Sequence, residues 1–85
     1  MENSYRLFLL AVEEMNFTKA AKKAFVTQQC LSSHIKRIEA ELNIRIFERS
    51  PRLTLTSAGE ALYETVRQIE LLEDNLTDRI SEIRD

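Results

Sequence analysis

The final third of the chain places the strongest constraint on its fold. From residue 57 to about residue 84 there is no proline, and the chain's single glycine lies in the first turn of this stretch. Seven apolar side chains keep a heptad register along one flank: Leu62, Val66, Ile69, Leu72, Leu76, Ile80 and Ile83. This pattern predicts one helix of roughly 27 residues, about 40 Å long. Only its first turns can pack on so small a domain, so the remaining stripe predicts dimerisation.

Size and composition limit what precedes this helix to one small domain. The chain has 85 residues, of which 44% are hydrophobic, with one glycine and one proline. We therefore predict a mainly α fold in two parts, a compact domain at residues 1–56 and a linker helix at residues 57–85. No apolar run is long enough to cross a bilayer, and the first residues lack the features of an export signal. The lone Cys30 cannot form an internal disulfide, which fits a reducing cytoplasm.

Residues 17–42 predict two short helices joined by a tight turn, with Thr18 and Thr27 as N-caps. In the second helix an apolar stripe should face the core, formed by Leu31, Ile35, Ile38 and Leu42. Another face is polar and mostly short-chained: Gln28, Gln29, Ser32, Ser33 and Lys36. Glutamine can pair with adenine through two hydrogen bonds, and serine can bond to bases or phosphates. The stretch therefore predicts a DNA-binding helix-turn-helix, although a polar face considered alone is also typical of a solvated surface.

Charge is distributed very unevenly along the chain, although the net charge is only −2. Residues 1–18 carry −2, residues 19–56 carry +5 and residues 57–85 carry −5. The basic block coincides with the helix-turn-helix and the segment after it, which indicates a local footprint for nucleic acid. Lys19 lies near the start of the motif's first helix, where backbone N–H groups can also meet a phosphate.

Two short segments, residues 46–49 and 52–55, flank a Ser-Pro pair and predict a β-hairpin wing. Arg49 and Arg52 lie near the predicted tip, from which they can reach phosphates or an adjacent minor groove. The alternative for each arginine is a solvated charge.

Further helix ends are predicted from capping residues. Asn3 or Ser4 should begin a first helix that serves as scaffold and runs to about residue 14. Asn43 should end the motif's second helix in left-handed backbone. Thr56 or Ser57 should cap the last helix.

Together these features resemble the N-terminal domain of LysR-type transcriptional regulators, over essentially all 85 residues. The residues found at the family's spacings are Phe17, Thr18, Ala20, Ala21, Val26, Thr27, Gln28, Leu31, Ser32, Ile35, Lys36, Ile38, Glu39, Leu42, Phe47, Arg49, Leu55, Thr56, Ala58 and Gly59. The resemblance implies a winged helix-turn-helix DNA-binding domain at residues 1–56, with three helices and a two-stranded β wing. It also implies that the helix at residues 57–85 pairs with its copy, usually antiparallel, in a homodimer on an inverted-repeat operator in double-stranded DNA.

The resemblance also implies roles for individual residues, most directly for Thr27, Gln28, Ser32 and Lys36. The full set of predicted DNA contacts is Thr18, Lys19, Thr27, Gln28, Gln29, Ser32, Ser33, Lys36, Arg49 and Arg52. Gln29 replaces a proline that is common in the family, and Ser33 is shorter than the family's usual side chain, so readout at these positions should differ. Family members are bacterial, cytoplasmic and nucleoid-associated, and they carry a C-terminal domain that binds a small-molecule effector. No such domain lies in these 85 residues, which suggests a fragment.

Two other classes of function stay open from the residues alone. The acidic last helix could pair with a different coiled coil, which would make the chain a protein-interaction module with a degenerate helix-turn-helix. An enzyme needs a catalytic constellation, and one histidine, one cysteine and no clustered carboxylates do not supply one. Cys30 and His34 share a helix face, but two ligands do not make a metal site. We therefore predict no catalytic residue, cofactor or metal.

Overall fold

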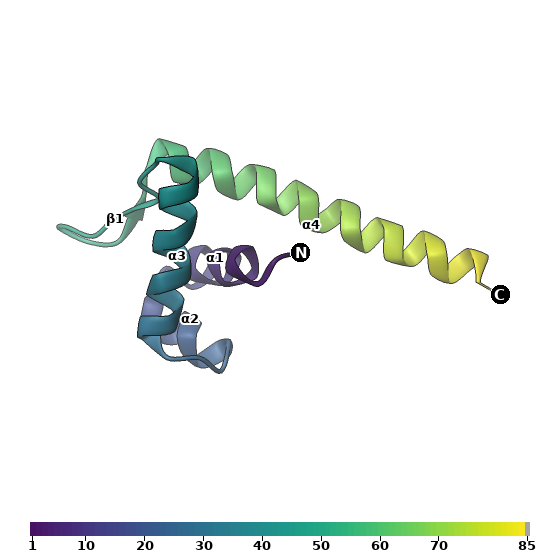
Figure 1. Cartoon of the computed structure of the whole chain (residues 1–85), viewed down its shortest axis with the longest axis horizontal. Coiled ribbons are helices and arrows are strands. Elements are labelled where there is room, and N and C mark those ends of the chain that lie inside the picture. Colours follow the sequence, from purple (N-terminus) through teal and green to yellow (C-terminus); the bar gives the residue numbers. More distant parts are fainter. Residues whose placement is uncertain (85) are drawn as a thin grey trace.

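The computed structural model describes residues 1–84, so the last residue of the predicted segment 57–85 lies outside the described residues. The elements are α1 (Asn3–Glu14), α2 (Phe17–Lys23), α3 (Gln28–Leu42), β1 (Phe47–Glu48), β2 (Thr54–Leu55) and α4 (Ser57–Ile83). Figure 1 shows α1, α2 and α3 packed together, the wing beside the upper part of α3, and α4 projecting away from them. The predicted mainly α fold, a winged helix-turn-helix followed by one long helix, is confirmed.

The core lies where the first three helices meet the base of the wing and the start of α4. Its most deeply enclosed large side chains are Phe8, Leu31, Ile38 and Ile46. The Phe17 ring meets the Phe47 ring edge-on, with 5.1 Å between centroids, and so joins α2 to β1. This packing fixes the wing against the helix-turn-helix.

Helix α1 begins without a side-chain cap, so the predicted cap at Asn3 or Ser4 is wrong. Glu2 occupies the N-cap position and its side chain makes no capping hydrogen bond. Ser4 is instead only 2% exposed, and its Oγ lies 2.7 Å from Nδ1 of His34. A buried hydroxyl needs a partner, and here the partner lies on α3, so the bond ties α1 to α3.

The N-cap of α2 is Asn16 and not Thr18 as predicted. The Asn16 side chain accepts a hydrogen bond from the Lys19 backbone N–H at 2.9 Å, which leaves Thr18 inside the helix with its hydroxyl free for another partner. The predicted cap of α3 is confirmed, because Thr27 Oγ1 accepts from the Cys30 backbone N–H at 3.0 Å. Helix α3 ends as predicted, with Asn43 in left-handed backbone at φ 55°.

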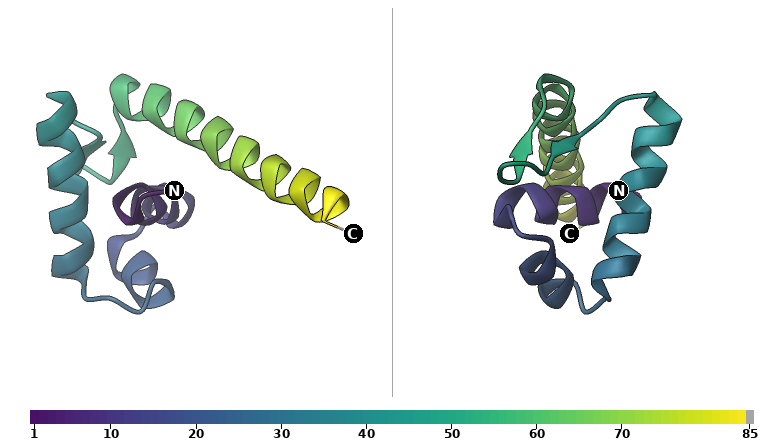
Figure 2. Two further views of the ribbon diagram at one scale, coloured as in Figure 1. Left: turned by 45° about the vertical axis from the view of Figure 1, so that its right-hand side comes forward. Right: turned by 90° about the vertical axis from the view of Figure 1, so that its left-hand side faces the viewer.

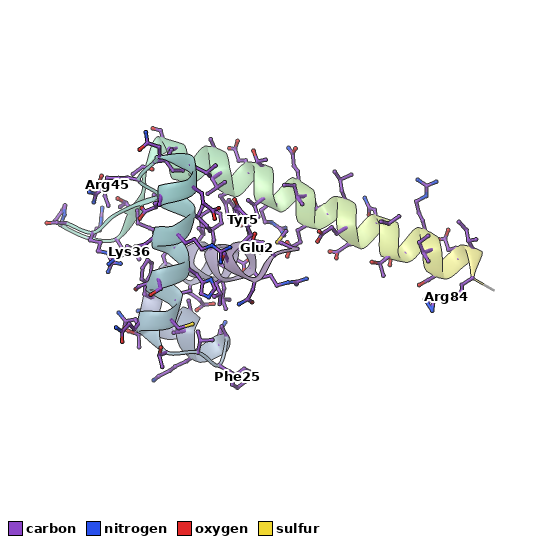
Figure 3. The ribbon with its side chains drawn as sticks, viewed as in Figure 1. Glu2, Tyr5, Phe25, Lys36, Arg45 and Arg84 are labelled. Atoms are coloured by element: carbon purple, nitrogen blue, oxygen red, sulfur yellow. The ribbon has the colours of Figure 1, made fainter. Side chains whose placement is uncertain are left out.

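The turn between α2 and α3 places a large apolar side chain in solvent. Phe25 has φ 58°, an uncommon backbone conformation for a bulky residue, and is 95% exposed. Figure 3 shows it pointing away from the ribbon at the lower end of the motif. The turn is closed by the Val26 backbone N–H, which donates to the Ala21 carbonyl at 3.0 Å, so the backbone of Phe25 takes part in the turn while its ring stays outside the core.

The wing is an antiparallel pair of two-residue strands, in which Phe47 faces Leu55 and Glu48 faces Thr54. The predicted strands were four residues each, so the hairpin exists but is shorter. Pro51 in the connection has no N–H to donate, so it cannot extend the ladder toward the tip.

Helix α4 is capped by Thr56, whose Oγ1 accepts from the Gly59 backbone N–H at 2.9 Å, while Ser57 is the first helical residue. The buried packing of α4 on the domain is confined to its first turns, although Glu73 further along pairs with the Met1 amino group at 3.1 Å. Val66 is 3% exposed, whereas Leu72 is 68% exposed. Figure 2 shows the rest of the helix extending well past the other elements, and the molecule is 52 Å along its longest axis.

Candidate nucleic-acid interface

The polar face of α3 lies on the surface of the molecule. Four of its side chains are exposed and one is half-buried at the edge of the wing: Gln28, Gln29, Ser33 and Lys36 are exposed, and Ser32 is half-buried. The opposite stripe is buried at Leu31, Ile35 and Ile38, but Leu42, its last predicted member, is 45% exposed. The buried stripe holds α3 in place, so the polar side chains project from a fixed helix.

The cations near this face fall into two groups. Three are engaged by carboxylates: Lys23 with Glu14, Arg37 with Glu2 and Glu41, and Arg45 with Glu48. Within residues 1–84, no carboxylate lies within 4 Å of the cationic nitrogens of Lys19, Lys36, Arg49 and Arg52. Figure 3 shows Lys36 on the wing side of α3 and Glu2 on the other side. The free charges therefore surround the polar face, and Arg37 points elsewhere.

The Lys23 ammonium is the most firmly engaged of these cations. Its Nζ donates a hydrogen bond to Glu14 at 2.7 Å, and this bond and the charge of Glu14 raise the pKa of Lys23 above its ordinary value. A phosphate would have to displace that carboxylate. Lys19 has no such competitor and is exposed near the start of α2.

Arg49 directly follows β1 in the connection between the two strands, and its guanidinium lies over the Phe17 ring of α2. Its Cζ is 4.6 Å from the centroid of the Phe17 ring, within the range of a cation–π contact. The guanidinium lines a surface hollow of about 240 Å³ together with Ser32, Lys36 and Arg45. Sequence reasoning missed Arg45 and the supporting role of Phe17, because both depend on how the wing folds back on the helices. Arg52 stays exposed in the connecting loop.

Thr18 and Gln28 meet where α2 passes the first turn of α3. The Thr18 hydroxyl donates a hydrogen bond to Gln28 Oε1 at 3.0 Å. Both side chains are exposed, and both line a shallow hollow of about 320 Å³ beside Arg49. The two hollows share Arg49, so Thr18 and Gln28 lie on one side of its guanidinium and Ser32 and Lys36 line the neighbouring hollow.

The Cys30 and His34 pair does not develop into a metal site in the part of the chain that the structure describes. His34 Nδ1 is engaged by Ser4, and residues 1–84 contain no group of three or more His, Cys, Asp or Glu side chains that could hold an ion. None of the helices over the same residues combines the length and the apolar character that a membrane span needs.

The apolar flank of α4 divides into a packed part and an exposed part. Val66 is buried and Leu62 is half-buried against the same chain's domain, whereas the later members are exposed: Ile69, Leu72, Leu76, Ile80 and Ile83. Leu71, which sequence analysis left out of the stripe, is also exposed. An apolar surface of this length on a projecting helix is typical of an interaction site.

Comparisons with known proteins agree with this arrangement. The family described as bacterial regulatory helix-turn-helix protein, lysR family, matches residues 3–60. The HTH-type transcriptional regulator CysL of Bacillus subtilis (strain 168) is 41% identical over 68 residues, covering 79% of this chain and 23% of CysL. The HTH-type transcriptional regulator BudR of Klebsiella aerogenes is 43% identical over 76 residues, covering 87% of this chain and 53% of BudR. The chain thus spans between a quarter and a half of these relatives.

Solved structures extend the match to the whole chain. The BenM DBD in complex with catB site 1 DNA superposes with a TM-score of 0.91 at 33% identity, covering 100% of this chain and 98% of that one. The CbnR DBD in its DNA complex gives a TM-score of 0.88 at 32% identity and covers 100% of both chains. The chain therefore belongs to the lysR family of bacterial regulatory helix-turn-helix proteins, and it is a DNA-binding domain of that family.

Proposed function

We propose that two copies of this chain bind one inverted repeat in double-stranded DNA, with α3 of each copy in a major groove, and thereby regulate transcription. The supporting observation is the exposed polar face of α3, surrounded by cations that have no carboxylate partner within residues 1–84. Base edges are contacted by Gln28, Gln29, Ser32 and Ser33. The sugar-phosphate backbone is contacted by Lys19, Thr27, Lys36, Arg49 and Arg52.

The homodimer forms through the exposed apolar flank of α4. Leu72 and Leu76 are 68% and 60% exposed, so their own domain does not cover them. Pairing of two such helices removes these side chains from water, the usual driving force for helix association. Half-sites are then about 34 to 36 Å apart, or a multiple of that spacing, so that both α3 helices meet the same side of the duplex.

The charge distribution also supports an orientation in which α3 faces DNA and α4 does not. The block that carries +5 contains α3 and the wing, and the block that carries −5 is α4 with the two residues after it. DNA attracts the first and repels the second, so the duplex is directed to α3 and away from the dimer interface.

The test is fluorescence anisotropy of labelled random and palindromic duplexes across a salt series, with sedimentation to give the oligomeric state. If three of the four cations proposed to contact the backbone meet phosphates in each copy, a dimer releases about six counterions, and the slope of log K against log salt is about −5. Lys36→Gln should weaken binding and reduce the slope's magnitude by about 2, because each dimer loses two contacts. The neighbouring Arg37→Gln is the matched control, since Arg37 is engaged by Glu2 and Glu41, and it should leave the slope unchanged.

Two results would count against the proposal. An affinity that does not change with salt contradicts the phosphate contacts. Equal effects of Lys36→Gln and Arg37→Gln contradict the assignment of Lys36, and not Arg37, to the DNA side of α3. A folded dimer that binds no duplex at low salt favours the alternative, a protein-interaction module that acts through the acidic α4.

The remaining parts of the proposal concern the cellular setting. Regulation of bacterial transcription places the chain in the cytoplasm, associated with the nucleoid. CysL is about four times as long as the region it shares with this chain, so we assign small-molecule sensing to a further domain and not to residues 1–85. The proposed role involves no catalytic step and no cofactor.

A further inference from the structure

The hydrogen bond between Thr18 and Gln28 sets one predicted base contact apart from the others. Thr18 is the second residue of α2 and Gln28 is the first residue of α3. Their bond, at 3.0 Å, is the one side-chain to side-chain hydrogen bond that joins α2 to α3 within residues 1–84. Over the same residues, the side chains of Gln29, Ser32 and Ser33 have no hydrogen-bond partner. Gln28 is therefore held by the protein before DNA arrives, and the other three are not.

The bond uses the only proton that the Thr18 hydroxyl can donate. Asn16, and not Thr18, accepts the capping hydrogen bond of α2, so Thr18 lies inside the helix as its second residue. A phosphate oxygen is purely an acceptor, so while Thr18 donates to Gln28 Oε1 it cannot also donate to the DNA backbone. The structure thus gives Thr18 a role different from a phosphate anchor.

The consequence at Gln28 follows from the chemistry of an amide. Oε1 has two lone pairs, of which Thr18 occupies one, and Nε2 keeps both of its N–H donors. A fixed amide of this kind can donate to N7 of adenine or guanine, and its second lone pair can accept from N6 of adenine. Cytosine presents only an N4 donor in the same groove, which can use the second lone pair of Oε1 but leaves Nε2 without an acceptor, so it is disfavoured.

We propose that Thr18 is a positioning residue that orients the Gln28 amide to read a purine, adenine above all, at one position of each half-site. The inference rests on the proposed function, since it concerns how the α3 face reads DNA. Holding the amide also lowers the rotamer entropy that Gln28 loses on binding, which favours the matched site over a mismatched one.

The experiment begins with selection of sites from a randomised duplex library by the 85-residue chain, which fixes the preferred sequence. Competition anisotropy then measures all four base pairs at each half-site position for the wild-type chain, Gln28→Ala, Thr18→Val, Thr18→Ser and the double variant Thr18→Val with Gln28→Ala. Valine matches threonine in shape and lacks only the hydroxyl, and serine restores it. Circular dichroism checks that each variant is folded.

The expected result has three parts. Gln28→Ala identifies the position that Gln28 reads by abolishing its preference. Thr18→Val lowers the preference for a purine over cytosine at that same position by about three- to tenfold, the scale of one neutral hydrogen bond, while Thr18→Ser retains it and affinity for random duplex stays constant. In the Gln28→Ala background, Thr18→Val has no further effect on base preference.

Other results overturn the proposal in distinguishable ways. A uniform loss of affinity for every sequence in Thr18→Val shows a backbone contact, and an unchanged preference shows that the bond does not act in the complex. A preference for cytosine at the Gln28 position contradicts the assigned amide orientation. If the wild-type chain binds no duplex, the proposed function fails first, and it does so without reference to Thr18.

Discussion

The junction between the wing and α4 gives a prediction at Gly59 that runs against ordinary helix propensity. Replacing a glycine inside a helix by alanine normally stabilises a protein by about 0.5 to 1 kcal/mol. Here a Cβ would lie 2.4 Å from the carbonyl oxygen of Ile46 and 3.0 Å from Cδ2 of Leu55. Both distances are well inside normal van der Waals separation, so either α4 or the segment that contains Ile46 would have to move.

The Ile46 carbonyl is poorly placed to yield. It accepts hydrogen bonds from the Thr56 backbone N–H at 3.0 Å and from Thr56 Oγ1 at 3.2 Å, and the Ile46 side chain is fully buried. Overpacking of such a site costs about 1 to 3 kcal/mol. After the gain in propensity is subtracted, Gly59→Ala should lower the free energy of unfolding by about 1 to 2 kcal/mol.

The assay is urea denaturation followed by circular dichroism at one fixed chain concentration, because the proposed dimerisation would make the midpoint depend on concentration. In a thermal scan of the same samples, the melting temperature should fall by at least about 4 °C. Glu64→Ala, at an exposed position on the next turn of α4, is the control and should change the free energy by less than about 0.5 kcal/mol. A Gly59→Ala chain as stable as wild type, or more so, would refute the close approach of α4 to Ile46.

Three further substitutions test other parts of the structure. Leu76→Asp puts a charge into the α4 interface and should yield a folded monomer of 9.9 kDa by sedimentation, with weaker binding to palindromic duplex; an unchanged dimer would exclude this interface. Thr27→Ala removes the cap of α3 and should lower the free energy of unfolding in urea by about 1 kcal/mol, while Thr27→Ser should not. Phe17→Leu removes the edge-on contact with Phe47 and the ring under Arg49, and should cost about 1 to 2 kcal/mol in urea and weaken DNA binding by anisotropy; unchanged values would show that the ring supports neither.

The helices were predictable from the sequence because their signals are local and periodic. The α4 stripe, the Thr27 cap and the left-handed Asn43 each depend on residues within one or two turns. The N-cap of α2 was not predictable in the same way, because Asn16 and Thr18 are both good caps and only the backbone at Met15, in left-handed conformation, decides between them.

Features that depend on distant residues were missed. Ser4 resembles a helix cap, yet its partner is His34, thirty residues away. The lysines and arginines look equivalent in the sequence, and only the folded chain shows that Lys23 is held by a carboxylate on α1 while Lys36 is free of one within residues 1–84. The position of Arg49 depends on the wing folding back on Phe17, which no local pattern encodes.

The close packing of Gly59 against the Ile46 carbonyl fixes the angle at which α4 leaves the domain. In a dimer joined along α4, the angle at which this helix leaves the domain sets how far apart the two α3 helices stand. Over a helix of about 40 Å, a change of about 10° in this angle moves the far end by about 7 Å, which is roughly two base pairs of duplex. In the proposed dimer, the spacing of half-sites is thus set by one tight contact between Gly59 and the carbonyl oxygen of Ile46.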